Sequence, residues 1–422
     1  MTSNRIVIVG GGFGGLHLLR ALERRLRPGE AEVTLLDRNN YHLFTPLLYQ
    51  VATGELPPHA VAYPLRRTVV REARYRFLQT DVERIDLEAR AVDTSDGRIP
   101  YDRLVLAAGS VTNDYGIPGV REHALGMKYL AEAQEVRRRI LSCFERADVV
   151  PDPEQRRQML TFIIIGAGPV GVELSASMRD LFDHSLRGSY ANVDVDRDPR
   201  ITLIDGGERV LATMDERLGR IAAKRLAELH VDVRLRTLVS EVADGGVRTR
   251  QGDELRANTI VWAGGVRVSP LVTSLGLPQS KGRLVVDGVF RVAGRDDLFA
   301  IGDAAYVEWQ GKPLAQLAQV AVLEAPALAA NLVHLIRGEP TEPYVHKEKG
   351  DLVALGRTSA AARLRRFLFV TVPRDVVFSG FPAWTVWRVN YLTQLLGVRN
   401  RASLLTEWLL SYFTTRMVSN IP

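Results

Sequence analysis

The chain carries two glycine-rich turns, GGGFGG at 10–15 and GAGPVG at 166–171. Each turn follows a short apolar run typical of a buried strand and precedes a stretch with helical periodicity. This order of strand, glycine turn and helix is typical of a dinucleotide-binding unit, in which the helix N-terminus offers free N–H groups to a pyrophosphate. Two such units in one chain predict an α/β protein with two Rossmann-like domains.

Both turns have three glycines at the spacing GxGxxG. The first glycine allows a tight bend, the second lets the backbone approach a pyrophosphate, and the third lets the helix pack closely on the strand. These positions are Gly10, Gly12 and Gly15 in the first turn and Gly166, Gly168 and Gly171 in the second. A single GxGxxG also occurs in turns that bind no nucleotide, so the prediction depends on the recurrence of the whole pattern.

An acidic residue is expected at the end of the strand after each turn, where it accepts hydrogen bonds from the hydroxyls of an adenosine ribose. Asp37 ends VTLLD after the first turn, and Asp205 ends ITLID after the second. A carboxylate at this position repels a 2′-phosphate, so Asp205 predicts a preference for NADH over NADPH. Arg209 lies close in sequence and could weaken that preference.

Three further segments fit a protein with two nucleotides. YDRLVLAAG (101–109) and TIVWAGG (259–265) are predicted strands that end in small residues, where the chain can pass close to a bound cofactor. LFAIGDAA (298–305) is a predicted buried strand followed by Gly302 and Asp303. We expect the Asp303 carboxylate to bind the ribityl hydroxyls of a flavin, with the N-terminus of the following helix facing the ring.

Composition is that of a large globular protein. Of the 422 residues, 46% are hydrophobic and 25% are charged. At about 150 residues a domain, this length predicts two or three domains. The single cysteine, Cys143, excludes an internal disulfide and a CxxC redox pair, and is predicted to be a buried structural thiol. The chain begins MTSNR and enters a strand directly, so we predict no secretory signal and nucleotide sites that face the cytoplasm.

The net charge of +6 is concentrated at the end of the chain. Residues 361–422 hold eight arginines and two acids, Asp375 and Glu407, which gives +6 and leaves the rest of the chain balanced. The arginines are Arg363, Arg365, Arg366, Arg374, Arg388, Arg399, Arg401 and Arg416. The same segment carries three of the five tryptophans, Trp384, Trp387 and Trp408.

Two amphipathic helices are predicted in this tail. Their apolar faces would comprise Trp384, Trp387, Tyr391, Leu392, Leu395 and Leu396, and Leu404, Leu405, Trp408, Leu409, Tyr412 and Phe413. Neither has the run of about 18 apolar residues that spans a bilayer. Helices rich in Trp, Leu and Arg suit an anionic membrane surface, so 381–422 is predicted to bind one. Packing on the protein itself or on a second subunit, as a homodimer, is the alternative. We predict no nucleic-acid partner, since the basic residues form no known reader motif.

Several longer segments carry a resemblance to a known family. They are NYHLFTPLLYQVATGELPPHAVAYPLRR (40–67), DVERID (81–86), WAGGVRVSPL, IGDAAYVEWQGKPL and LGVRNR. In these segments, and over essentially its whole length, the chain resembles the type II NADH dehydrogenases. These are single-subunit flavoproteins that pass electrons from NADH through FAD to a membrane quinone. The resemblance implies an FAD domain at 1–110 and 281–335, an NADH domain at 111–280, and a C-terminal membrane-surface or dimerisation domain at 336–422.

The resemblance also implies roles for single residues. The positions that match FAD contacts are Gly10, Gly12, Gly15, Asp37, Arg38, Val82, Gly109 and Asp303. Those around NADH are Gly166, Gly168, Gly171, Asp205 and Gly264. Glu173 matches a glutamate near the nicotinamide and the quinone side of the flavin, where it would assist proton movement. A carboxylate that only complements the helix dipole is the alternative. Lys349 matches a lysine of the family's C-terminal domain, with a solvated lysine as the alternative.

The expected quinone site departs from the family. Its pattern resembles AQxAxQ, with two glutamines near the flavin ring and the quinone head. This chain has AQVAVLEA, so Gln319 holds the first position, Leu323 holds the second, and Glu324 follows. A leucine side chain cannot donate a hydrogen bond to a quinone carbonyl. The acceptor therefore either binds differently or is a different molecule, and Gln319 stays with Glu173 as a candidate catalytic residue.

These features predict an enzyme that moves a hydride from NADH to FAD and then two electrons to a membrane quinone, peripheral to the membrane and without pumping protons. The hydride step depends mainly on distance and alignment. One alternative is an NAD(P)H-dependent flavin reductase that acts on a non-quinone small molecule, and another is a flavin redox sensor. A sulfide:quinone reductase is excluded, because its redox cysteines are absent.

Overall fold

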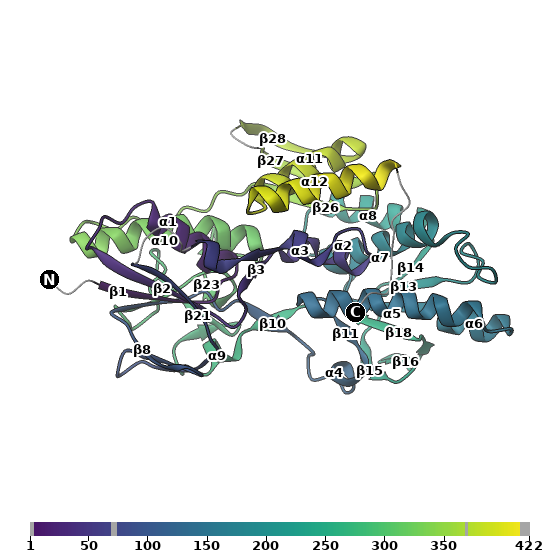
Figure 1. The fold of residues 1–422 in the computed structure, drawn as a ribbon, viewed down its shortest axis with the longest axis horizontal. Helices are drawn as coiled ribbons and strands as arrows, with labels where there is room; N and C mark the ends of the chain where they lie inside the picture. Colours follow the sequence, from purple (N-terminus) through teal and green to yellow (C-terminus); the bar gives the residue numbers. More distant parts are fainter. Residues whose placement is uncertain (1–3, 69–73, 368–369, 414–422) are drawn as a thin grey trace. The chain divides into compact units, whose positions relative to one another are not determined.

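The computed structural model describes residues 4–68, 74–367 and 370–413. They form two compact units (Figure 1). The described residues of Met1–Leu43, Ala62–Val111 and Val266–Lys347 make up the first unit. Those of Phe44–Val61, Thr112–Gly265 and Glu348–Pro422 make up the second. The chain therefore passes between the units several times.

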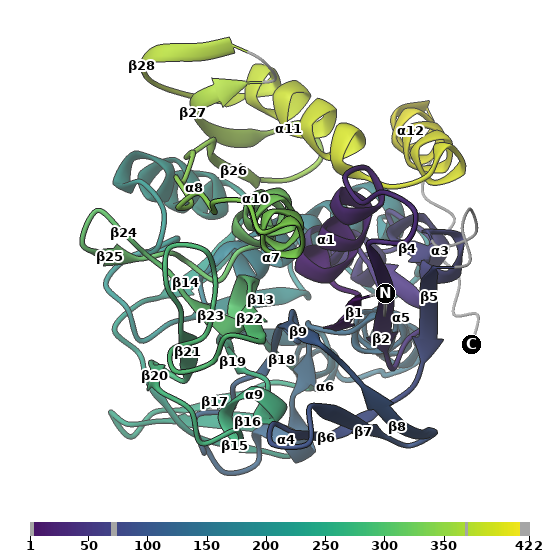
Figure 2. The same cartoon turned by 90° about the vertical axis from the view of Figure 1, so that its left-hand side faces the viewer.

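The first unit is built on a five-stranded parallel sheet. In spatial order its strands are β22 (Leu298–Ala300), β9 (Arg103–Leu106), β1 (Asn4–Val9), β2 (Ala31–Asp37) and β5 (Tyr75–Gln79). The central strands β1 and β9 are mostly runs of Val, Ile and Leu buried on both faces, as expected for a parallel sheet covered by other elements, whereas the edge strand β5 alternates buried and exposed residues. Helices α1 (Phe13–Glu23) and α10 (Ala318–Arg337) pack side by side over this sheet (Figure 2).

Smaller antiparallel elements complete the first unit. They are the hairpin β3 (Tyr41–Leu43) with β4 (Ala62–Pro64), and the sheet of β6 (Val82–Asp86), β7 (Ala91–Thr94) and β8 (Gly97–Pro100). A third group comprises β20 (Gln279–Ser280), β21 (Arg283–Val285) and β23 (Ala305–Tyr306), beside the hairpin of β24 (Glu308–Trp309) and β25 (Lys312–Pro313). The short 3-10 turn η4 (Gly302–Ala304) joins β22 to β23.

The second unit repeats the plan of the first. Its parallel sheet has the order β11 (Leu125–Gly126), β18 (Thr259–Trp262), β12 (Thr161–Ile165), β13 (Arg200–Ile204) and β14 (Val231–Arg234). Its main helices are α5 (Leu130–Asp148), α7 (Pro169–Leu181) and α8 (Glu216–Glu228). An antiparallel sheet of β15 (Val239–Ala243), β16 (Gly246–Thr249) and β17 (Glu254–Arg256) belongs to the same unit. Cys143 is buried on α5, as predicted.

The last part of the chain adds a three-stranded antiparallel sheet and two helices to the second unit. These are β26 (Gly350–Ala354), β27 (Ala360–Phe367), β28 (Val370–Gly380), α11 (Phe381–Gln394) and α12 (Val398–Phe413). Short helices α2 (Leu48–Ala52) and α3 (Pro58–Val61) also lie in this unit. The predicted fold class, two Rossmann-like halves and a helical C-terminal part, is confirmed. The finer boundaries at 110, 280 and 335 stay predictions.

The tryptophan-bearing faces of the tail helices are not free to meet a membrane. Trp384, Trp387, Trp408 and Leu404 are buried in the second unit. On α12, the side chains that remain outside are Leu405, Leu409 and Leu410, which are 46%, 52% and 48% exposed. Residues four apart share one side of a helix and their immediate successors are turned about 100° away. The predicted face of α12 is therefore only partly available: Leu404 and Trp408 are buried, whereas Leu405 and Leu409 remain about half exposed.

Most of the described tail arginines are used inside the protein. Arg363 and Arg365 donate to Asp375, and Arg401 donates to the carbonyl oxygens of Leu395 and Thr393. The Arg388 guanidinium lies 3.7 Å from the ring centroid of Trp384 and 4.6 Å from that of Trp408, and 3.8 Å from the Glu55 carboxylate. The described part of the structure does not include the side chains of five further residues named in the prediction, which are Arg366, Arg374, Tyr412, Phe413 and Arg416. Among the tail arginines whose side chains are described, Arg363, Arg365 and Arg388 thus lie within 4 Å of a carboxylate.

Helix α10 is the one helix in the described residues that is long and apolar enough to cross a membrane. Half of its most apolar stretch is buried in the protein. Its inward side includes Glu324, Leu328 and Leu332, and it packs on α1. These contacts are those of a core helix in the first unit.

Candidate functional site

The first glycine turn joins β1 to α1 and has the geometry that a dinucleotide cradle needs. Gly10 has φ +105°, and a Cβ there would lie 2.3 Å from the Ala107 carbonyl oxygen. A Cβ on Gly15 would lie 1.9 Å from the Gly10 carbonyl oxygen. A Cβ on Gly12, in contrast, would meet no atom within 4 Å. Gly10 and Gly15 are therefore required by the fold, whereas the space at Gly12 is left open for a ligand.

Asp37 is fixed against this turn. Its Oδ2 accepts a hydrogen bond from the Gly11 N–H at 2.6 Å, and its Oδ1 accepts one from the Asn39 N–H at 2.7 Å. Burial raises the pKa of the carboxyl, and these two hydrogen bonds oppose the shift. The end of β2 thus holds a carboxylate beside the start of α1, and its role in binding a ribose stays a prediction.

The second glycine turn, between β12 and α7, matches the first in detail. Gly166 has φ +109° and its Cβ would lie 2.3 Å from the Ala263 carbonyl oxygen. A Cβ on Gly171 would lie 1.9 Å from the Gly166 carbonyl oxygen, and one on Gly168 would meet nothing within 4 Å. Asp205 accepts from the N–H groups of Ala167 and Gly207, each at 2.6 Å. The two units therefore carry the same cradle.

Arg209 is committed to its own loop. Its guanidinium donates to the carbonyl oxygens of Leu211, Ala212 and Met214 at distances of 2.8–3.0 Å. A guanidinium held by three carbonyls is poorly placed to bind a phosphate as well. The predicted effect of Asp205 on coenzyme choice is therefore not offset by this arginine.

The remaining predicted FAD contacts all lie in the first unit. Arg38 follows Asp37 and is exposed beside Asp81, at 3.4 Å. Val82 begins β6, and Gly109 follows β9 with φ +64° and open space at its Cβ position. Asp303 lies in η4 and accepts from the Ser110 hydroxyl. The next α-helix, α10, begins only at Ala318, after three short strands.

His42 is a residue of the first cradle that the sequence did not single out. It is buried, its Nδ1 lies 3.1 Å from the Gly11 carbonyl oxygen, and its ring packs edge-on against Phe13 at 4.8 Å. Burial lowers its pKa to about 4, so the ring is neutral at pH 7. His42 supports the turn from the β3 hairpin. Its position inside NYHLF was the only sequence signal.

Gly264 lies two residues after the end of β18, in the second unit. A Cβ there would lie 2.8 Å from the Trp262 ring, whose indole N–H donates to the Asn113 carbonyl oxygen at 2.8 Å. Glycine at 264 therefore leaves room for this indole.

Glu173 is buried on α7, only 6% exposed. Its Oε1 accepts from the Ala354 N–H on β26 at 3.0 Å. Burial raises its pKa to about 8, so the carboxyl is largely protonated at pH 7. A charged carboxylate that only complements the helix dipole would be solvated, which makes that alternative a poor fit to this buried group.

Two buried phenols of the second unit are affected by the charge of Glu173. Helices α2 and α7 pack together, and Thr53, the residue that follows α2, is hydrogen bonded to Ser177 of α7 at 2.8 Å. Tyr49 precedes Thr53 by one turn on α2, and Glu173 precedes Ser177 by one turn on α7. The Glu173 charge acts on the phenols of Tyr49 and of Tyr391 on α11, and burial raises both phenol pKa values well above the usual range. The arrangement can hold protons in a site sheltered from water.

Gln319 and Glu324 lie on different sides of α10. Gln319 and Leu323 are half-buried, in the first two turns of the helix. Glu324 is 1% exposed, and its Oε2 accepts from the Gly302 N–H at 2.6 Å. Glu324 therefore does not take the place of the missing second glutamine. Lys349 is exposed just before β26.

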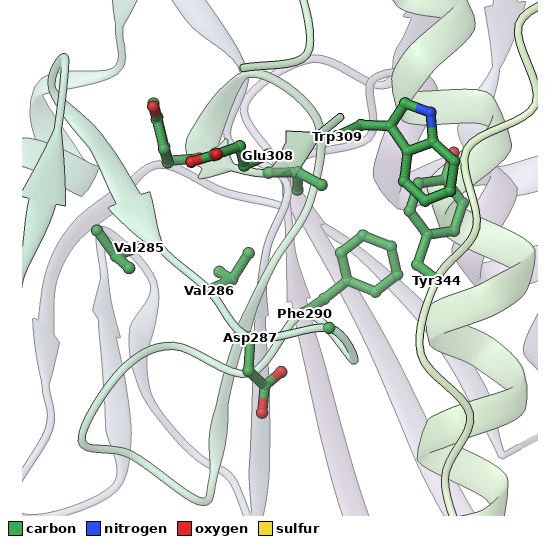
Figure 3. Close-up of a pocket in the computed structure, with 10 residues that line it drawn as sticks. Val285, Val286, Asp287, Phe290, Glu308, Trp309 and Tyr344 are labelled. Atoms are coloured by element: carbon green, nitrogen blue, oxygen red, sulfur yellow. The ribbon is translucent and has the colours of Figure 1, made fainter. Parts of the chain in front are cut away.

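A cavity of about 230 Å³ lies elsewhere in the first unit (Figure 3). It is lined by Val285, Val286, Asp287, Gly288, Phe290, Tyr306, Val307, Glu308, Trp309 and Tyr344. None of the predicted site residues belongs to this lining. In the described ranges of the chain, no cluster of three or more His, Cys, Asp or Glu side chains could hold a metal ion.

Comparisons with known proteins agree with this architecture. Residues 4–325 match the model of the pyridine nucleotide-disulphide oxidoreductase family. The chain is 34% identical to the type II NADH:quinone oxidoreductase Ndh of Mycobacterium tuberculosis, over 98% of this chain and 89% of that protein. It is 32% identical to the type II NADH:quinone oxidoreductase of Haemophilus influenzae, over 85% of this chain and 86% of that protein.

A solved structure gives the same fold over the full length. The Plasmodium falciparum NDH2 structure in complex with NADH covers 100% of both chains, with a TM-score of 0.87 and 20% sequence identity. The resemblance inferred from the sequence is confirmed. The paired cradles, the family match and the near full-length relatives together show that this chain belongs to the type II NADH:quinone oxidoreductases, within the pyridine nucleotide-disulphide oxidoreductase family.

Proposed function

We propose that the chain oxidises NADH and reduces a membrane quinone through FAD, without pumping protons. The supporting observation is the pair of matching cradles, each with a fixed carboxylate and an open second glycine. The first cradle, with Gly12, Asp37 and Asp303, fits FAD, and the second, with Gly168 and Asp205, fits NADH. Bound FAD supplies the chemistry of hydride acceptance and electron transfer.

The residues of the two units divide the remaining tasks. Gly10 and Gly15, and likewise Gly166 and Gly171, shape the turns, and we propose that Arg38, Val82 and Gly109 contact FAD and that Gly264 lies near NADH. Glu173 holds a proton in a buried site and is the proposed proton donor for quinone reduction. Gln319, at the start of α10, is the proposed hydrogen-bond donor to the acceptor.

Steady-state turnover tests this function. Purified protein with bound FAD should oxidise NADH rapidly when a short-chain quinone is supplied, and slowly without one. The alternative acceptor, a non-quinone small molecule, is favoured by one observation, the apolar Leu323 where the family has a glutamine. Fast turnover with other acceptors and none with quinones would select that alternative. Bound FAD without turnover on any acceptor would refute both.

Coenzyme choice should depend on the charge of Asp205. The substitution Asp205→Asn removes the repulsion of a 2′-phosphate, and we expect the preference for NADH over NADPH, as a ratio of kcat/KM values, to fall about 10- to 100-fold. Asp232→Asn, an exposed carboxylate of β14 in the same unit, is the matched control and should leave the ratio unchanged. An Asp205→Asn enzyme that keeps the original ratio would contradict the assignment of this cradle to NADH.

We further propose that α12 meets an anionic membrane through Leu405, Leu409 and Leu410. Their replacement by serine removes exposed apolar area only, and we expect affinity for anionic vesicles to fall about 100-fold with flavin reduction intact. Serine at the exposed Val149, Leu238 and Val345 is the control. Sedimentation with vesicles measures the effect, and equal binding by both variants would refute the proposal. Removing 381–422 is a poorer test, because Trp387 and Trp408 belong to the core.

A further inference from the structure

Glu324 is a buried acid that the proposed hydride and quinone chemistry leaves without a task. It lies on the inward side of α10 and is 1% exposed. Its Oε2 accepts from the Gly302 N–H at 2.6 Å, across the turn that carries Asp303. The contact lies wholly within the first unit. A buried carboxyl is costly, so its presence at this point calls for a physical reason.

The Gly302–Asp303 turn is held from both sides. Gly302 has φ +64°, and a Cβ there would lie 3.0 Å from the Cβ of Ala321, one turn before Glu324 on α10. Asp303 accepts from the Ser110 hydroxyl, and Gln316 donates to the Asp303 carbonyl oxygen at 3.4 Å. Helix α10 therefore seats the turn through Ala321 and Glu324. The Asp303 side chain, proposed to hold the flavin's ribityl chain, is placed by the same turn.

The charges around Glu324 come from three other elements. Burial raises the pKa of Glu324 to about 8, and the negative charge of Asp303 in η4 adds to this rise. The hydrogen bond from Gly302 and the positive charge of Arg283 in β21 act in the opposite direction and lower the pKa. Tyr344, on the segment before β26, also senses the Glu324 charge, which contributes to its raised phenol pKa. Arg283 donates to the Leu314 carbonyl oxygen at 2.8 Å and lies over the Tyr306 ring. Glu324 is thus neutral at pH 7 and poised to respond to added charge.

We infer that Glu324 is a positioning residue of the flavin site that also takes up a proton when the flavin is reduced. The inference rests on the proposed function, because it requires FAD beside Asp303. NADH delivers a hydride, which is two electrons and one proton, so the site gains one negative charge. An ionised Glu324 nearby then binds a proton from solvent more tightly than before. If Glu324 is ionised before reduction, the flavin site gains two electrons and two protons in total. If Glu324 is already protonated, the site gains two electrons and one proton.

The pH dependence of the flavin potential tests this inference. For a two-electron couple, each proton taken up moves the potential by about 30 mV per pH unit. We expect the wild-type slope to steepen from about 30 to as much as about 60 mV per unit above about pH 8. In Glu324→Gln, which can still accept from Gly302 but cannot ionise, the slope should steepen less than in wild type. Glu173 is a second buried acid with a pKa of about 8, so the comparison is repeated in the Glu173→Gln background, where the steepening should remain with Glu324 and be lost with Glu324→Gln.

The structural role has its own measurement. Glu324→Leu leaves the Gly302 N–H without a partner, so we expect FAD affinity to fall about tenfold or more relative to Glu324→Gln. Parallel slopes in wild type and Glu324→Gln would overturn the proton uptake while leaving NADH oxidation in place. If Glu324→Gln retains no FAD, the comparison of wild type with Glu173→Gln decides: a wild-type slope that does not steepen, or a steepening lost in Glu173→Gln, would refute the inference. A wild type without flavin would instead refute the proposed function.

Discussion

Gly12→Val should give a well-folded protein that retains no FAD. The backbone at Gly12 is extended, with φ −70° and ψ −162°, so valine fits it without strain. A Cβ there meets no protein atom within 4 Å, and the new side chain therefore fills only the space proposed for the pyrophosphate. We expect the purified variant to be colourless, with the thermal stability of the wild-type apoprotein.

Gly168→Val is the partner experiment in the second cradle. Gly168 has φ −73° and ψ −175°, and its Cβ position is equally open. This variant should keep its FAD and its yellow colour, whereas the NADH concentration needed for half-reduction should rise about 100-fold or more, a loss of roughly 3 kcal/mol. The two substitutions are chemically identical, so a difference in which ligand is lost separates the two cradles.

Two neighbouring glycines control for folding. Gly15→Val and Gly171→Val each place a Cβ about where a carbonyl oxygen already lies, at 1.9 Å, and should destabilise the fold itself. Circular dichroism and thermal unfolding distinguish that outcome from ligand loss. A Gly12→Val protein with normal FAD content, or a Gly168→Val protein with normal NADH affinity, would show that the pyrophosphates bind elsewhere.

Glu173→Gln should reduce quinone turnover by about 100-fold or more and leave reduction of the flavin by NADH nearly unchanged. The carboxyl holds a proton below its raised pKa of about 8, and glutamine keeps the shape without that proton. Wild-type quinone turnover should accordingly decline as pH rises through about 8, and the variant should lose this decline. Stopped-flow reduction by NADH and steady-state quinone turnover measure the two steps separately.

The Glu173 carboxyl should also make the stability of the protein depend on pH. Its folded pKa is raised above the ordinary value of 4.5, so the native state binds the proton more tightly than the unfolded chain does. Its contribution is fully present below pH 4.5 and is lost as pH rises through about 8. Glu173→Gln should flatten that part of the curve of unfolding free energy against pH. Quinone turnover equal to wild type across this range would refute the role of Glu173.

The cradles were predictable because their determinants are local. The strand, the glycine spacing and the acid at the next strand end all lie within one short βαβ segment, and the order of parallel strands follows from such segments. Gly10, Gly15, Asp37 and their counterparts lie where the pattern predicts. The burial of Cys143 was predicted in the same way, from its place in a helical stretch.

Other features depend on contacts between distant segments and could not be predicted from the sequence. An apolar helical face indicates burial but not the surface it packs against, so Trp384 and Trp408 were assigned to a membrane. The difference from the family pattern at 323–324 drew attention to Glu324, but the sequence did not indicate where its side chain points. That direction depends on which side of α10 faces the core. No local sequence pattern indicates that Phe44–Val61 belongs to the second unit, where α2 with Tyr49 packs against α7.

The most direct test of the central claim is an anaerobic titration of the purified protein, followed by its visible spectrum. We expect a flavin spectrum before any addition, and bleaching by about one equivalent of NADH per flavin, since each hydride carries two electrons. NADPH should bleach it only at much higher concentration. A colourless protein that takes up no FAD, or a bound flavin that NADH fails to reduce, would contradict the claim that the two cradles form one electron-transfer path.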